Sequence, residues 1–351
     1  MKQIDGKKWT YGFLTIFLAA LLLCAVLTIV VDPYFHYHKP LNGVSYELNN
    51  ERYMNDGIAR HFDYDAVIIG TSMTHNFKTS EFDVLFDVNA IKVPYSGAGY
   101  KELGESLDRL LSRNPEVKKV MWVVDFSNLL EPDDWERYSE YPEYLYDNNA
   151  LNDTPYLLNK SVMYHGVLAN LISTLQGKDS TTFDEYSAFD RPTGENGIAF
   201  TVEEEGKLSV EQRDILEEEL QMVQSTITKN IKAVIDAYPD TEFLIVIPPY
   251  HESYLHMQAQ KGLMNAYLDA EKEALRILCE CSNAKLYCYM DMYEVVCNID
   301  YYSDSVHYTA EINSEILQWI AEDMGRITAD NYEAHVEATR EFYLDYIIEE
   351  K

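Results

Sequence analysis

Ser72 and an Asp-x-x-His motif near the other end of the chain are the residues best suited to chemistry. Ser72 follows the apolar run 66–69 within Gly70-Thr71-Ser72, and Asp304 stands three positions before His307. A serine hydroxyl is a poor nucleophile until an imidazole accepts its proton, and that imidazole needs a carboxylate to fix its tautomer. The three residue types together predict a serine hydrolase or acyltransferase in which Ser72 attacks, His307 moves the proton and Asp304 orients His307.

The elements that must position these residues alternate between strands and helices. Short apolar or β-branched runs predict five strands, at 66–69, 88–93, 120–125, 243–247 and 285–290. Apolar residues three and four apart predict helices at 50–61, 101–111, 209–237, 262–278 and 310–324. This alternation predicts an α/β fold, a three-layer sandwich with a central five-stranded parallel sheet. Ser72 then lies at the carboxyl edge of the sheet, where such folds place their sites.

The segment 11–31 is uncharged and apolar, and at about 21 residues it matches the thickness of a bilayer core when helical. Lys2, Lys7 and Lys8 precede it and Asp32 follows it, so the positive-inside rule places the amino terminus in the cytoplasm. A cleaved signal peptide is the alternative, but no small-x-small site ends this segment. We therefore expect a cytoplasmic stub and single-pass anchor at 1–31, a juxtamembrane collar at 32–64 and an extracytoplasmic domain at 65–351.

Composition narrows the range of partners and cofactors. A net charge of −31 excludes nucleic acid as a partner, because such binding needs clustered lysine and arginine. Of the five cysteines, Cys24 lies within the apolar segment, and the four between 279 and 297 leave disulfides and free thiols both open. The pair Cys279 and Cys281 lacks a second pair at zinc-ligand spacing. No metal and no cofactor are therefore expected.

The connection at about 130–206 is acidic, rich in tyrosine and too long for a plain loop. We expect it to form a small helical insertion over the carboxyl edge of the sheet. Tyrosines offer flat apolar faces with a hydroxyl group, so the insertion could serve as a lid or a sugar-binding rim. Local packing of the tyrosines is the alternative.

The order of these motifs resembles the SGNH (GDSL-like) hydrolase superfamily over residues 65–325. Ser72 follows the first strand, Gly97 follows the second within Tyr95-Ser96-Gly97, and Asp304-x-x-His307 precedes a late helix. The resemblance implies a flavodoxin-like sheet and an oxyanion hole formed by the backbone N–H groups of Ser72 and Gly97.

The third motif of that superfamily, Gly-x-Asn-Asp, is absent after the third strand. The chain there reads Asp125-Phe126-Ser127-Asn128. Either Asn128 supplies the third oxyanion donor, or Asp125 holds the loop. Three further residues at the same sheet edge are candidate substrate contacts: His75, Tyr250 and His251.

The anchor and the Gly-Thr-Ser sequence are most similar to exported bacterial proteins of cell-envelope acylation, such as the D-alanine transfer protein and alginate acetylation proteins. This likeness implies an esterase or O-acyltransferase acting on an envelope polysaccharide or teichoic-type polymer. A membrane-bound O-acyltransferase is the partner it implies. A non-catalytic scaffold for envelope assembly with the same fold is the alternative function.

Overall fold

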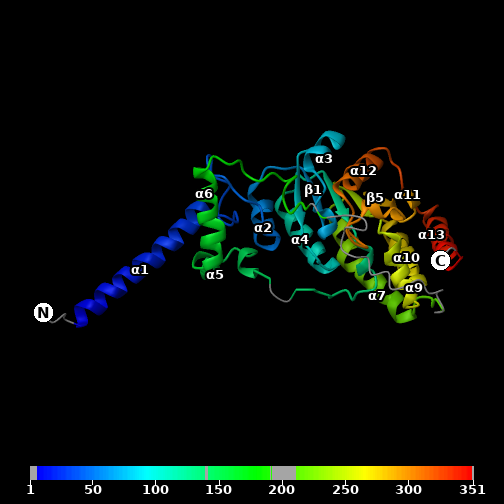
Figure 1. The fold of residues 1–351 in the computed structure, drawn as a ribbon, viewed down its shortest axis with the longest axis horizontal. Helices are drawn as coiled ribbons and strands as arrows, with labels where there is room; N and C mark the ends of the chain where they lie inside the picture. The colour runs from blue at the N-terminus through cyan, green and yellow to red at the C-terminus, as the bar shows by residue number, and fades with distance from the viewer. Residues whose placement is uncertain (1–5, 139–140, 190, 192–210, 350–351) are drawn as a thin grey trace. The chain divides into compact units, whose positions relative to one another are not determined.

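The computed structural model describes residues 6–138, 141–189, 191 and 211–349, and these fall into two compact units. Residues 1–62 and 140–182 make up the N-terminal unit, and residues 63–139 and 183–351 make up the sheet unit. The elements of both units are labelled in Figure 1. The middle part of the predicted tyrosine-rich insertion, residues 140–182, therefore groups with residues that precede the sheet, a grouping that spacing in the sequence does not reveal.

The N-terminal unit is helical in its described part. Its elements are α1 (Gly6–Val31), α2 (Glu51–His61), η3 (Glu143–Leu145), α5 (Thr154–Leu157), the π-helix η4 (Val162–Leu168) and α6 (Ala169–Leu175). In the described part of the chain, α1 is the helix that is long and apolar enough to cross a membrane. Its large apolar side chains, among them Phe17, Leu18 and Leu22, are exposed. This agrees with the apolar segment predicted at 11–31, which α1 extends by five residues at its start.

Asp32 fixes the turn that follows α1. Its side chain is fully buried, and its two oxygens accept hydrogen bonds from the backbone N–H groups of residues 36–38 at 2.7–3.0 Å. The hydroxyl of Tyr156 donates to the same carboxylate at 2.7 Å. Because a buried carboxylate needs several donors to remain stable, this residue ties the end of α1 to α5.

The sheet unit contains six strands, which lie in the order β2-β1-β3-β4-β5-β6. The strands are β1 (Ala66–Gly70), β2 (Ala90–Pro94), β3 (Lys119–Val123), β4 (Glu242–Ile247), β5 (Ala284–Cys288) and β6 (Arg326–Ile327). The first five pair in parallel, and β6 pairs antiparallel with β5. All residues of β1 and β2 are buried, as expected for strands covered on both faces.

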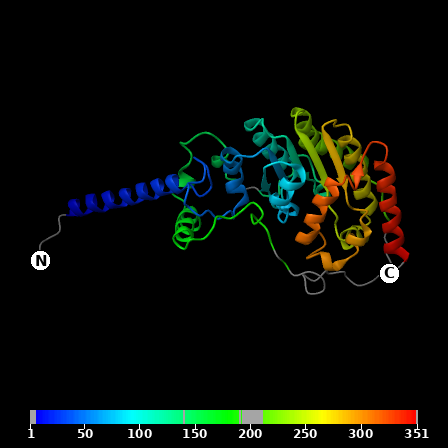
Figure 2. The same ribbon diagram turned by 90° about the horizontal axis from the view of Figure 1, so that it is seen from above.

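The helices of the sheet unit are α3 (Thr79–Phe86), α4 (Tyr100–Arg113), α7 (Glu217–Ile227), the π-helix η6 (Thr228–Lys232), α8 (Ala233–Ala237), α9 (Glu252–Gln260), α10 (Met264–Leu278), α11 (Tyr293–Val296), α12 (Ala310–Ala321) and α13 (Tyr332–Glu349). Short 3₁₀ turns are η1 (Ser72–Thr74), η2 (Phe126–Asn128) and η7 (Ile299–Tyr301). The α-helices of this unit pack in two groups. In one group α7 contacts both α4 and α10, and in the other α3 contacts α12. Helices lie on both faces of the sheet (Figure 2), as expected for parallel strands joined by helical crossovers.

The predicted α/β class is confirmed, and the five predicted strands are each found within two residues of their expected bounds. The expected purely parallel five-stranded sheet needs correction, because β6 makes the sheet six-stranded and mixed. A two-residue strand is too short to produce an alternating pattern and could not be predicted from one. All five cysteines are free thiols.

Candidate functional site

Ser72 lies in the turn that leaves the carboxyl end of β1. A Cβ atom at Gly70 would stand 2.9 Å from the carbonyl oxygen of Val123, so only glycine fits where β1 passes β3. The hydroxyl of Thr74 donates to the carbonyl of Thr71 at 2.7 Å and closes the turn. This local geometry leaves Ser72 half-buried between buried neighbours.

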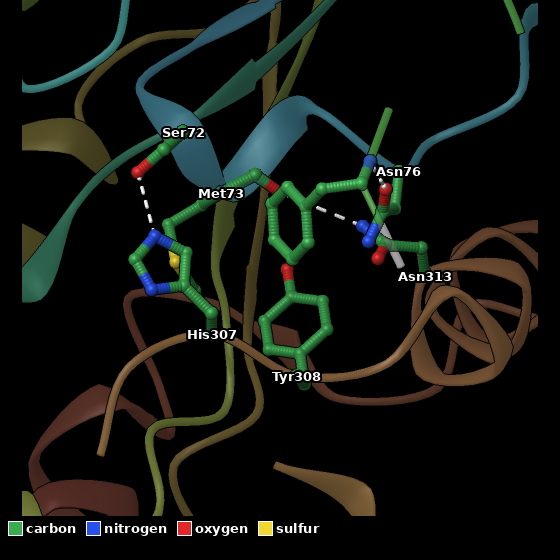
Figure 3. Close-up of a pocket in the computed structure, with 7 residues that line it drawn as sticks. Ser72, Met73, Asn76, His307, Tyr308 and Asn313 are labelled. Carbon is green, nitrogen blue, oxygen red and sulfur yellow. Dashed lines mark hydrogen bonds between the residues drawn. The ribbon is translucent and has the colours of Figure 1, made fainter. Parts of the chain in front are cut away.

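Ser72, His307 and Asp304 form a continuous chain of hydrogen bonds. The Oγ of Ser72 lies 2.8 Å from Nε2 of His307 (Figure 3), and Nδ1 of His307 lies 2.8 Å from Oδ2 of Asp304. Because the carboxylate can only accept a hydrogen bond, the neutral ring carries its proton on Nδ1. Nε2 is then free to accept the serine proton. The geometry is that of an activated serine nucleophile.

Asp304 is held by the loop that carries His307. Its Oδ1 accepts hydrogen bonds from the backbone N–H groups of Val306 at 2.9 Å and of His307 at 2.7 Å. Burial raises the pKa of Asp304, but the hydrogen bonds from the His307 ring and from these backbone groups outweigh it, so the pKa lies below its usual value. The carboxylate therefore stays ionised, as a residue that orients an imidazole must.

A small pocket opens beside the Ser72 hydroxyl. The empty space there, with the adjoining open solvent included, is about 160 Å³. Its walls are Ser72, Met73, Asn76, Phe189, His307, Tyr308 and Asn313. The ring of Phe189 packs edge-on against the ring of His307, with 5.7 Å between the centroids. The backbone N–H of Phe189 donates a hydrogen bond to Oδ1 of Asn76 at 2.9 Å. Met73, Phe189 and Tyr308 make the pocket largely apolar.

Asp125 joins the loops around the pocket. Its Oδ2 accepts from the hydroxyl of Thr71 at 2.9 Å, and its Oδ1 accepts from Ser127 Oγ at 2.7 Å and from the hydroxyl of Tyr250. Burial, and then the charge of Asp125, raise the pKa of Tyr250 well above its usual value, so the phenol remains a donor. Of the two expectations for this loop, the structure favours Asp125 as the residue that holds it. Asn128 instead donates to the carbonyl of Ala98 at 3.0 Å.

We expect Asp125→Ala to lower the free energy of unfolding by about 3 kcal/mol or more, because it leaves several buried donors without an acceptor. Tyr250→Phe removes one of these donors and is expected to cost only about 1 kcal/mol. Urea unfolding of the purified full chain measures both. A loss for Asp125→Ala no larger than that for Tyr250→Phe would contradict the role given to Asp125.

The structure places the other predicted site residues differently. Tyr250 is fully buried and His251 is 5% exposed, and neither lines the pocket beside Ser72. Tyr250 turns inward to Asp125, and His251 caps α9 by accepting from the N–H of Ser253 at 3.2 Å. His75 is 9% exposed, and its Nε2 lies 2.9 Å from the hydroxyl of Ser96. Gly97 has a φ of +65°, which favours glycine.

Several residues of the site were not expected from the sequence. Phe189 and Arg191 belong to the tyrosine-rich connection, and Nη1 of Arg191 lies 3.7 Å from Oδ2 of Asp304. The segment before them is anchored by the buried Lys92, whose Nζ donates to the carbonyls of Phe77 at 3.0 Å and of Asp184 at 3.4 Å. Lys92 stands out in the sequence because it is a charged residue within the apolar strand β2, and this pattern could have indicated a buried lysine that holds a neighbouring segment. Residues 192–206 of the predicted insertion lie outside the described residues.

Comparison of the chain with protein-family models and with curated proteins finds no match.

Proposed function

We propose that this protein is a serine esterase or O-acyltransferase of the SGNH type, with Ser72 as nucleophile. The observation that carries the proposal is the unbroken contact from Asp304 through His307 to Ser72, at 2.8 Å for each step. Oriented imidazoles of this kind occur where a hydroxyl must be deprotonated for attack on a carbonyl carbon.

In the proposed reaction, Ser72 Oγ attacks the ester carbonyl while His307 Nε2 takes its proton. His307 then gives that proton to the leaving alcohol, and an acyl-serine remains. Water or a sugar hydroxyl, deprotonated by His307, then attacks the acyl carbon. The bond from that carbon to Ser72 Oγ breaks, His307 returns the proton to Oγ, and the acyl group leaves as the free acid or as the sugar ester. The backbone N–H groups of Ser72 and Gly97 are the proposed oxyanion donors. Asn128 contributes through its bond to Ala98, which holds the loop of Gly97.

The proposed setting is the outer face of a bacterial membrane. A helix long and apolar enough to span a bilayer supports an anchor, and the lysines at its start support a cytoplasmic amino terminus. An anchored, outward-facing site fits a cell-envelope polysaccharide or teichoic-type polymer as substrate. A membrane-bound O-acyltransferase that supplies or receives acyl groups is the proposed partner.

The reaction is tested with the purified full chain and an acetyl ester, in the presence and absence of a glycan acceptor. Mass spectrometry of the products separates the two proposed activities, because a transferase acetylates the glycan and an esterase yields acetate alone. Neither product is expected from Ser72→Ala. A folded chain that gives neither acetate nor acetylated glycan would favour the scaffold function over catalysis.

The small pocket predicts a preference for short acyl groups. Pockets for drug-sized ligands hold roughly 300 Å³ or more. All the empty space beside Ser72 is about 160 Å³ even when the adjoining open solvent is counted, so the pocket itself is smaller than this. We expect kcat/KM for an acetyl ester to exceed that for an octanoyl ester by about 10-fold or more. A series of p-nitrophenyl esters of increasing chain length measures this ratio.

Met73→Ala enlarges the pocket and is expected to reduce that preference. Met257→Ala is the matched control, since Met257 is 37% exposed and does not line the pocket. An equal or greater rate with the octanoyl ester in the unchanged chain would show that this pocket does not receive the acyl group.

A further inference from the structure

A second cluster of reactive side chains lies within the sheet unit, apart from the Ser72 pocket. Glu271 of α10, Cys288 at the end of β5 and His335 of α13 each offer a ligand atom, and these atoms all lie within 4.8 Å of one another. Glu271 and Cys288 are fully buried, and the side chain of His335 is 8% exposed. None of the three lines the pocket beside Ser72. Figure 2 shows α13, in red, beside α10, in yellow.

Two polar atoms of this cluster lack a protein partner. Oε2 of Glu271 and Nε2 of His335 are buried, and neither atom has a hydrogen-bond partner within the described part of the chain. Buried polar atoms are almost always paired, because leaving one unpaired costs free energy. Two such atoms in one cluster, beside a thiol, indicate a shared ligand.

The charges of the cluster favour a divalent cation as that ligand. Cys288 Sγ lies 3.0 Å from Oε1 of Glu271, and burial raises the pKa of both groups. Two acids this close cannot both ionise in a buried site without a counter-charge. A divalent cation neutralises one carboxylate and one thiolate together. A thiolate with an imidazole selects zinc over magnesium and calcium, which prefer oxygen ligands.

Asp291 completes the arrangement around His335. Its Oδ2 lies 3.2 Å from Nδ1 of the imidazole, which fixes the ring and leaves Nε2 to bind a metal. A carboxylate behind a metal-binding histidine is the usual support of zinc sites. Ligand atoms around a tetrahedral zinc lie roughly 3.5 Å apart, so closing the cluster onto an ion requires only small shifts of side chains.

We propose that Glu271, Cys288 and His335 bind a zinc ion that fastens α13 and α10 to β5. Cys288 binds as the thiolate through Sγ, Glu271 through a carboxylate oxygen and His335 through Nε2, with water as the fourth ligand. The protons of the thiol and of any protonated carboxyl leave to solvent, and the ion remains Zn²⁺ throughout. The site is independent of the proposed function at Ser72.

Cobalt absorption spectroscopy on the purified full chain tests this site. Co²⁺ replaces Zn²⁺ in such sites, and a cysteine ligand then gives a thiolate-to-metal charge-transfer band in the near ultraviolet. We expect this band at about one Co²⁺ per chain, and we expect Zn²⁺ to abolish it. Cys288→Ser should lose the band, whereas Cys281→Ser should keep it. Cys281 is the matched control because it is also a buried free cysteine.

Thermal unfolding gives a second readout that does not depend on the cysteine variant. Zn²⁺ added to the chelator-treated chain should raise Tm by several degrees, and His335→Gln should abolish this shift. A folded chain that shows no cobalt band and no Tm shift would overturn the proposal. A band that survives in Cys288→Ser would equally overturn it, because the metal would then lie elsewhere.

Discussion

Replacement of Ser72 with alanine is expected to lower kcat/KM for an acetyl ester by about 10⁴- to 10⁶-fold. The reason is that the proposed reaction requires an acyl-serine, and no other hydroxyl in the described pocket stands 2.8 Å from an imidazole held by a carboxylate. Steady-state hydrolysis by the purified variant measures the loss. Circular dichroism of the same sample shows whether the variant is folded.

Ser96→Ala is the matched control for this prediction. The hydroxyl of Ser96 also contacts an imidazole, that of His75, at 2.9 Å. Ser96 does not line the pocket beside Ser72. We therefore expect Ser96→Ala to lose less than about 10-fold, a small fraction of the loss expected at the nucleophile. A larger loss for Ser96→Ala than for Ser72→Ala would reverse the assignment of the nucleophile.

Asp304→Asn is expected to lower kcat by about 10⁴-fold while leaving KM nearly unchanged. The asparagine Oδ1 can keep the two backbone hydrogen bonds from Val306 and His307, so the loop should retain its shape. The amide nitrogen would then face Nδ1 of His307. The amide NH₂ donates hydrogen bonds and cannot accept one, so Nδ1 would have to become the acceptor. The ring proton would then move to Nε2, and the ring could no longer accept a proton from Ser72.

Arg191→Gln separates this effect from a general change of charge. Arg191 lies 3.7 Å from the same carboxylate, but its side chain is 41% exposed. Exposed ion pairs contribute little, so we expect a loss below about 5-fold. Comparable losses in the two variants would indicate that local charge, and not the tautomer of His307, governs the rate.

The strands of the sheet unit could be predicted because each is a compact apolar run. Burial on both faces removes polar residues from β1 and most of β3 and β4, and turn residues mark their ends. The contact of Asp304 with His307 was equally predictable, because residues three positions apart in a tight turn lie close enough for their side chains to meet. The two-residue β6 and the grouping of residues 140–182 with residues 1–62 leave no such local pattern.

Other parts of the site depend on tertiary packing that a pattern does not encode. Tyr250 was expected to face a substrate because it follows β4, yet its hydroxyl turns to the buried Asp125. Phe189 lies far from both motifs in the sequence and reaches the pocket because the segment before it is anchored at Lys92. Glu271, Cys288 and His335 come from three separate elements, and their approach follows from the packing of α10 and α13.

The nucleophile itself can be identified by fluorophosphonate labelling of the purified full chain, followed by peptide mass spectrometry. A fluorophosphonate reacts with a serine whose hydroxyl is activated by an imidazole, and it leaves a stable phosphonyl ester on that residue. We predict a single labelled serine, Ser72, and no label in His307→Ala. A folded chain that remains unlabelled, or that carries the label on a different serine, would contradict the proposed catalytic site.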